Sequence, residues 1–174
     1  MLALFKHKKS YKDAARNVYA MALSSTRSAE FYERYGVPDS FDGRFDLLVL
    51  HVFLVFNRML KDDRVEAEAF NQALFDVTFE DMDQTLREMG IGDMGVPKHQ
   101  RRMMTGFNGR MHVYETALAQ KEMPEALKRN LYGTIDSPDE KILDDMVVKI
   151  NDMIHVLNAQ NGADILNGQV RFLL

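Results

Sequence analysis

Basic side chains that could bind an anion gather between positions 97 and 113, where no acidic residue occurs. The cluster includes Lys98, His99, Arg101, Arg102 and Arg110. If this stretch is helical, its first cations oppose the helix dipole by a few tenths of a kcal/mol up to about 1 kcal/mol each. Stability alone therefore does not favour this order. We interpret four of these residues as candidate contacts to an anionic partner: Lys98, Arg101, Arg102 and Arg110.

Three kinds of anion suit this cluster: RNA phosphates, lipid headgroups and an acidic protein surface. The cluster lacks the interleaved exposed aromatic residues that stack on bases, so phosphate-backbone or headgroup contact is the better match. A solvated face that binds nothing is the alternative. The net charge of −4 argues against a dedicated nucleic-acid binder, and we expect no DNA partner.

The residues that could ligate a metal ion do not show a metal-binding spacing. His51 has no Glu-x-x-His pair to join it, so we interpret it as a buried, hydrogen-bonded structural histidine. Glu80, Asp81 and Asp83 lack EF-hand spacing and are interpreted as a solvated acidic face or a docking face for a basic partner. The chain has no cysteine and no nucleophile–base motif, Walker loop or dinucleotide fingerprint. We therefore predict no enzyme activity, no cofactor and no metal.

The element that must position these residues is a helix at about 43–60. From residue 45 to residue 60 it is apolar at nearly every position, and no glycine, proline or run of polar residues interrupts this part as would be usual for strands. A helix that is apolar all round is buried by other helices. Its uninterrupted apolar part, residues 47–56, is half the roughly 20 residues that a membrane span needs.

The rest of the sequence predicts further helices, and only the tail 163–174, with a hairpin turn signal at Asn167-Gly168, is left open. Helical spacing of apolar residues is found at 10–25, 28–35, 64–89, from 97 onward, at 124–133 and from 138 onward. In the stretch 64–89 the apolar face is Phe75, Phe79, Met82, Leu86 and Met89. We predict an all-α fold, a single-domain bundle of six or seven helices around the central helix. Residues 10–174 form this domain, and residues 1–9 form a flexible basic and apolar tail that carries no secretory signal.

Four segments of the chain resemble the ubiquinol–cytochrome c chaperone family, the Cbp3-like assembly factors. They are YGVPDSFDGRFDLLVLHVFLVFNRM (35–59), ALFDVTFEDMDQTLREMGIGD (73–93), FNGRMHVYETAL (107–118) and ALKRNLYG (126–133). The positions that match the family pattern are Asp39, Gly43, Arg44, His51, Arg58, Phe79, Asp81, Asp83, Arg87, Gly90, Gly109 and Arg110.

The resemblance implies a non-enzymatic assembly chaperone for the respiratory cytochrome bc1 complex (ubiquinol–cytochrome c reductase). Its client would be newly made cytochrome b or another subunit of that complex, with peripheral contact to an anionic membrane or the ribosome. Because the sequence begins without a presequence, we expect a bacterial member that acts in the cytoplasm, at the inner face of the cell membrane.

The shape of the apolar site distinguishes the chaperone from an alternative function. A chaperone would hold its client in an open groove of methionine and aromatic side chains beside the basic helix. The alternative is a helical protein that encloses a lipid or a small apolar ligand around His51.

Overall fold

The fold is built around α3 (Phe41–Leu60), whose side chains are buried on almost every side. The computed structural model describes residues 2–135 and 138–173 and, from residue 11 on, their side chains. Leu47, Leu50, Val52 and Val55 are fully buried. Helices α1 (Leu2–Thr26), α4 (Glu66–Glu88), α5 (Val96–Gln120) and α7 (Glu140–Asn158) all pack against α3. The predicted central helix is confirmed.

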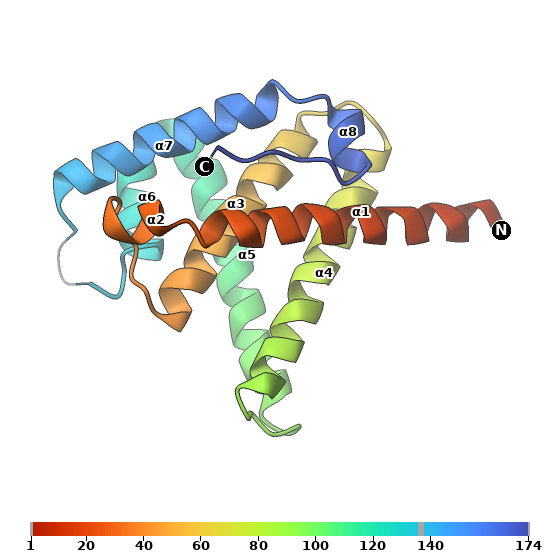
Figure 1. Cartoon of the computed structure of the whole chain (residues 1–174), viewed down its shortest axis with the longest axis horizontal. Coiled ribbons are helices and arrows are strands. Elements are labelled where there is room, and N and C mark those ends of the chain that lie inside the picture. The colour runs from red at the N-terminus through yellow and green to blue at the C-terminus, as the bar shows by residue number, and fades with distance from the viewer. Residues whose placement is uncertain (1, 136–137, 174) are drawn as a thin grey trace.

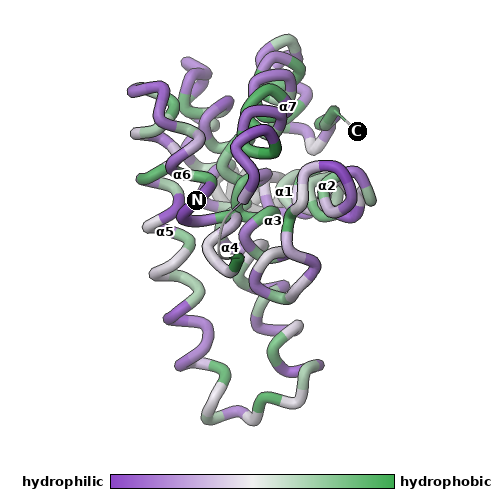
Figure 2. Tube along the Cα trace, turned by 90° about the vertical axis from the view of Figure 1, so that its left-hand side faces the viewer, coloured by the Kyte–Doolittle hydropathy of each residue, from purple (hydrophilic) through white to green (hydrophobic). Residues whose placement is uncertain are grey.

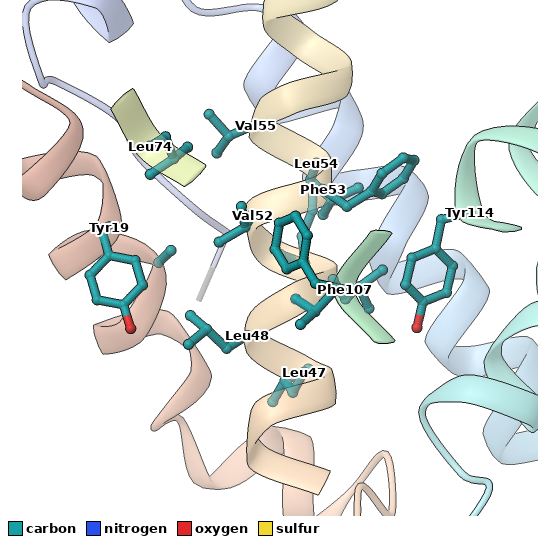
Figure 3. Close-up of a cluster of buried hydrophobic side chains, with 14 of the residues drawn as sticks. Tyr19, Leu47, Leu48, Val52, Phe53, Leu54, Val55, Leu74, Phe107 and Tyr114 are labelled. Carbon is teal, nitrogen blue, oxygen red and sulfur yellow. The ribbon is translucent and has the colours of Figure 1, made fainter. Parts of the chain in front are cut away.

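Neighbouring helices divide the surface of α3 between them. Leu48 and Val52 lie on the side of Tyr19 from α1, whereas Phe53 lies on the side of Tyr114 from α5 (Figure 3). The rings of Phe53 and Tyr114 are 5.5 Å apart between centroids. This arrangement encloses the apolar run without a membrane, and no helix in the described part of the chain combines the length and apolar character needed to span one.

The described residues form eight helices and no strand, which confirms the all-α prediction. The remaining helices are α2 (Ala29–Glu33), α6 (Met123–Asn130) and α8 (Gly162–Leu166). The short helix α8 is the one that apolar spacing did not predict. Its N-cap is Asn161, whose side chain accepts a hydrogen bond from the amide of Ala163.

The start of α3 is determined by a cap and a close backbone approach. The hydroxyl of Ser40 accepts a hydrogen bond from the amide of Gly43 at 3.1 Å, which moves the first helical residue to Phe41. A Cβ atom at position 43 would lie 2.1 Å from the carbonyl oxygen of Pro38, so only glycine fits. Arg44 and Asp39 form an ion pair of 2.6 Å across the same turn.

Two parts of the chain extend beyond the packed body. The connected ends of α4 and α5 project away from the other helices (Figures 1 and 2), and so do the first turns of α1 (Figure 1). Helix α1 begins at Leu2 and not near residue 10, so the backbone expected as a tail is helical; its flexibility stays a prediction. Met89, expected on the buried face of α4, is 56% exposed because α4 ends at Glu88, in the projecting part.

Candidate functional site

The basic side of α5 lines a pocket of about 370 Å³ between the start of α3, the first half of α5 and the end of α6. All three helices supply ionisable side chains to its wall. They are Asp42 and Asp46 from α3, His99, Arg102 and Arg110 from α5, and Arg129 from α6. Phe41, Phe45 and Met103 add apolar surface. The pocket therefore combines positive charge with an apolar wall.

An ion pair between α3 and α5 lies in the wall of this pocket. Arg110 Nη2 is 2.7 Å from Asp46 Oδ1, and the Asp46 side chain is 7% exposed. Arg110 Nη1 also donates to the carbonyl of Gly106 at 3.2 Å, and its guanidinium lies 6.0 Å from the centroid of the Phe45 ring. A charge removed from water needs such a partner, because a buried unpaired charge destabilises a fold strongly.

Several polar atoms around this ion pair have no hydrogen bond in the described part of the chain. Asp46 Oδ1 meets Arg110 Nη2 at ion-pair distance but without hydrogen-bond alignment. Arg110 Nε and the Tyr114 hydroxyl are buried and also lack partners. Burial raises the pKa of Asp46 to about 7, Arg110 opposes this shift and Asp42 adds to it. Asp46 can therefore change charge near neutral pH.

The four predicted contact residues divide into two pairs. Arg102 and Arg110 line the pocket, whereas Lys98 and Arg101 are exposed on the first turns of α5 outside it. Arg110 is not the free cation that the sequence suggested, because Asp46 from α3 pairs with it. The sequence analysis missed Asp46 and Arg129. The available signal for Asp46 was an acidic residue at the start of an otherwise apolar helix.

His51 is fully buried in α3, which confirms its interpretation as a hydrogen-bonded core residue. Its Nδ1 lies 2.9 Å from the carbonyl of Leu47, so that nitrogen carries the proton and Nε2 accepts from the Ser25 hydroxyl at 3.0 Å. The rings of Phe31 and Phe172 lie 5.3 and 5.4 Å from its ring. Burial lowers the pKa of His51 to about 4, so the ring is neutral at pH 7. Side chains of the protein therefore fill the space around His51 in which the lipid-binding alternative placed its ligand.

Two of the three residues predicted to form the acidic face of α4, Glu80 and Asp81, contact α1. Lys12 and Arg16 of α1 form ion pairs with Glu80, and the Tyr19 hydroxyl donates to Asp81 at 2.6 Å. Asp83 pairs with Arg87 at 2.6 Å. Glu80 and Asp81 therefore join this side of α4 to α1, whereas Asp83 pairs within α4, and the Glu80 side chain stays half exposed. No group of three or more metal-ligating side chains occurs among the residues that the structure describes.

Most positions that match the family pattern stabilise the fold. Arg58 donates to the carbonyls of Leu157 and Gln160, at 3.3 and 3.0 Å, and so ties the end of α3 to the end of α7. The ring of Phe79 packs 5.4 Å from that of Phe107.

The family positions near the α4–α5 turn make contacts only within that turn or determine its backbone conformation. Arg87 contacts Asp93, and Gly90 has φ +81°, a left-handed conformation that ends α4. Gly109 is exposed, and nothing in the structure explains it. Arg110 is thus the family position that reaches the pocket.

A second hollow runs along the other flank of α5. Phe56, Val65, Ala69, Phe75 and Asn108 line an open depression of about 640 Å³ between α3, α4 and α5. A neighbouring depression of about 470 Å³ shares Phe75 and adds Phe79, Gln100 and Met104. We call these two depressions the α4–α5 groove. Its wall combines the apolar side chains of Phe56, Phe75, Phe79 and Met104 with polar ones, which are Glu68, Asn71 and Gln72 in the first depression and Asp76, Glu80 and Asp83 in the second.

Comparison with known protein families gives a match over most of the chain. A family model described as Ubiquinol-cytochrome C chaperone matches residues 33–172. A crystal structure of the Cbp3 homolog from Brucella abortus has the same fold, with a TM-score of 0.81 and 30% sequence identity. The superposition covers 99% of this chain and 96% of the Brucella chain.

Curated proteins similar to this chain come from eukaryotes. Ubiquinol-cytochrome c reductase complex assembly factor 1 of Mus musculus is 26% identical over 164 residues, which cover 92% of this chain and 55% of the mouse protein. Protein CBP3, mitochondrial, of Saccharomyces cerevisiae is 26% identical over 147 residues, 82% of this chain and 44% of the yeast protein. The chain thus spans about half the length of these relatives.

Proposed function

The chain belongs to the ubiquinol–cytochrome c chaperone family, and we propose on this premise that it is an assembly chaperone for the respiratory cytochrome bc1 complex. The observation that carries the proposal is the family match over residues 33–172, supported by a solved structure of the same fold from a Cbp3 homolog. The mouse relative is named as an assembly factor of the ubiquinol–cytochrome c reductase complex. The protein acts by binding and not by catalysis.

The proposed client is newly made cytochrome b or another subunit of the bc1 complex. The α4–α5 groove offers it an apolar surface around Phe75, open to solvent and so able to receive and release a segment of chain. Phe56 and Phe79 flank Phe75 in this surface. Large aromatic side chains supply most of the contact energy in such surfaces.

The proposed place of action is the cytoplasm, at the inner face of the cell membrane. Lys98 and Arg101 are exposed on the projecting α4–α5 hairpin, beside Met94, which is 97% exposed. Cations near an anionic membrane surface contribute about 1 kcal/mol each. This hairpin therefore suits peripheral contact with anionic lipid close to the site where the client is inserted, and contact with the translating ribosome fits the same position.

Site-specific photocrosslinking tests the client and the groove together. Benzoylphenylalanine replaces Phe75, which preserves an aromatic side chain in the groove. The matched control carries the same group at Val148, which is 58% exposed on α7 and does not line the groove. Cytochrome b is synthesised in vitro with membranes and either protein. We expect a crosslink from position 75 and none from position 148.

Two outcomes would contradict the proposal. Capture of no bc1 subunit from position 75, with binding of the protein to the same membranes intact, would exclude this client. Equal crosslinking from both positions would show that contact is unspecific and that the groove does not select the client.

A further inference from the structure

Three guanidinium groups line the pocket between α3, α5 and α6, and two of them have no acidic partner. Arg102 and Arg129 form no ion pair among the described residues. Arg110 is paired with Asp46, yet its buried Nε has no hydrogen-bond acceptor. Guanidinium groups that line a cavity without an acidic partner can bind an acceptor from outside, so Arg102 and Arg129 indicate an anion site, and Arg110 adds positive charge beside them.

We propose that this pocket binds a phosphate group, carried either by a small phosphate ester or by the phosphomonoester headgroup of a lipid. Arginine forks bind oxyanions through paired charge-assisted hydrogen bonds. The volume of about 370 Å³ lies within the usual range for small-ligand sites. Phe41, which is 40% exposed, and Phe45 provide apolar wall for the organic part of the ligand.

The charges of the pocket favour a dianion. Three guanidinium groups face two carboxyl groups, Asp42 and Asp46, which leaves an excess of one positive charge. A phosphomonoester carries about −1.5 to −2 charges at neutral pH. If Asp46 takes up a proton on binding, the excess rises to two and matches the ligand. The pKa of Asp46 near 7 makes this proton uptake accessible.

Other titratable groups lie near Asp46 or line the pocket, and the pH experiment below takes them into account. Tyr114 and Asp42 lie near Asp46, and His99 and Arg129 line the pocket. The site is separate from client binding, because Gln100, Met104 and Asn108 of the α4–α5 groove lie on a different flank of α5. The phosphate site goes beyond the proposed function and is tested on purified protein without a client.

The first test removes the two unpaired cations. Binding of glycerol 3-phosphate is measured by titration calorimetry for the parent and for R102Q/R129Q. The matched control R101Q/K128Q loses the same charge from the adjacent positions of the same helices, neither of which lines the pocket. Each charge-assisted hydrogen bond is worth about 1.5–3 kcal/mol, so we expect at least about tenfold weaker binding in R102Q/R129Q and parent-like binding in the control.

A second variant moves Arg110 without changing any charge. A Cβ atom at position 106 would lie 2.8 Å from Arg110 Nη1, so Gly106→Ala must displace the guanidinium, which is the end of a flexible side chain. We expect weaker glycerol 3-phosphate binding and a lower melting temperature, because the displaced guanidinium also leaves Asp46. Circular dichroism at the assay temperature checks that the variant is folded, and parent-like binding by the folded variant would exclude a role for Arg110.

The pH dependence tests the role of Asp46. Sulfate keeps both its charges across neutral pH, so its binding is compared at about pH 6 and about pH 8. The parent and His99→Gln should bind sulfate more tightly at the lower pH, and Asp46→Asn should lose this difference. A difference that vanishes in His99→Gln and persists in Asp46→Asn would overturn the assignment of proton uptake to Asp46.

Vesicles distinguish the two sources of phosphate. Binding to phosphatidic acid vesicles that depends on Arg102 and Arg129, without binding of glycerol 3-phosphate, supports the lipid source. Binding of the soluble ester with the same dependence supports the small molecule. If neither probe binds to the parent, or if R102Q/R129Q and R101Q/K128Q lose binding equally, the pocket is not a phosphate site; the groove crosslink at position 75 can still succeed.

Discussion

Two buried polar residues of α3 respond to pH in opposite directions. His51 is held neutral, with its pKa lowered to about 4, whereas Asp46 has its pKa raised to about 7. Burial is the largest cause of both shifts, because it disfavours the charged form of each side chain. The sequence showed that both residues stand out from an apolar run, but the direction of each pKa shift follows from burial, which only the fold produces. Arg110 opposes the shift at Asp46, and the carbonyl of Leu47 opposes it at His51.

These shifts predict opposing contributions to stability. The His51 contribution is fully present above its unfolded pKa of about 6.5 and is lost as the pH falls toward about 4, on the order of 3 kcal/mol in all. The Asp46 contribution is fully present below its unfolded pKa of about 3.8 and is lost as the pH rises through about 7.

Urea unfolding between about pH 4.5 and 7.5 distinguishes the contribution of His51 from that of Asp46. Relative to the parent, His51→Gln should lose stability as the pH rises to about 6.5, because the variant lacks the favourable histidine contribution. Relative to the parent, Asp46→Asn should gain stability as the pH rises to about 7. A variant whose stability runs parallel to that of the parent would show that the replaced group keeps its ordinary pKa in the fold.

Periodicity in the sequence predicted most helices, and it predicted best where one face meets the core. The continuous apolar run identified α3, because Leu47–Val55 is buried on all sides. The spacing of apolar residues from position 97 onward identified α5, in which Met103, Phe107 and Tyr114 are among the buried residues. Met89 was placed in the core because its spacing continued a regular pattern past the point at which the partner helices end.

The burial of α3 predicts large losses on truncation. Leu50→Ala and Phe53→Ala should each lower the free energy of unfolding by roughly 2–5 kcal/mol, because Leu50 is fully buried and Phe53 is 4% exposed. Leu60→Ala is the matched control in the same helix, since Leu60 is 69% exposed, and should stay within about 0.5 kcal/mol of the parent. Chemical denaturation decides, and a loss below about 1 kcal/mol in Leu50→Ala would contradict the burial.

We predict that the exposed cations in the first turns of α5 contact anionic membranes and do not stabilise the fold. Changing Lys98, Arg101 and Arg102 to Gln should leave the melting temperature unchanged or slightly higher, because all three are exposed and Lys98, in the first turn, opposes the helix dipole. Sedimentation with anionic vesicles should fall and lose its salt dependence.

The control for this experiment is K121Q/K128Q/K141Q, which removes the same charge from other exposed positions. It should sediment like the parent. If the Lys98, Arg101 and Arg102 variant also sediments like the parent, the basic cluster is a solvated face, and the membrane contact proposed for the hairpin is wrong.

At the scale of the whole molecule, contacts between distant segments hold the helices in place. Arg110 meets Asp46, Lys12 meets Glu80, and Lys149 reaches Glu30 at 2.9 Å. Each pair joins helices that are not adjacent in sequence. Local patterns describe one helix at a time, so they could indicate charged faces but not which charges meet. For this reason the basic cluster was predictable from the sequence, and the pocket that three of its five residues line was not.

Arg58 is the clearest test of these long-range contacts. Its side chain is 13% exposed and joins α3 to the end of α7 through the carbonyls of Leu157 and Gln160 and to Asp62. Arg58→Ala should lower the free energy of unfolding by about 2–4 kcal/mol, because it leaves buried acceptors without a donor. Hydrogen exchange should accelerate in α8 and the last turn of α7. Arg27→Ala, at an exposed position, should change neither; equal effects in both variants would show that the link contributes nothing.

The central position of α3 has a consequence for the order in which the protein is made. Its partners α5 and α7 follow it along the chain, and roughly 100 residues separate the end of α3 from the end of α7. At a synthesis rate of about 5–20 residues per second, the apolar run leaves the ribosome about 5–20 s before its last partner exists. During that interval this chain is itself an aggregation-prone segment in need of shelter, the same condition in which its proposed client is found.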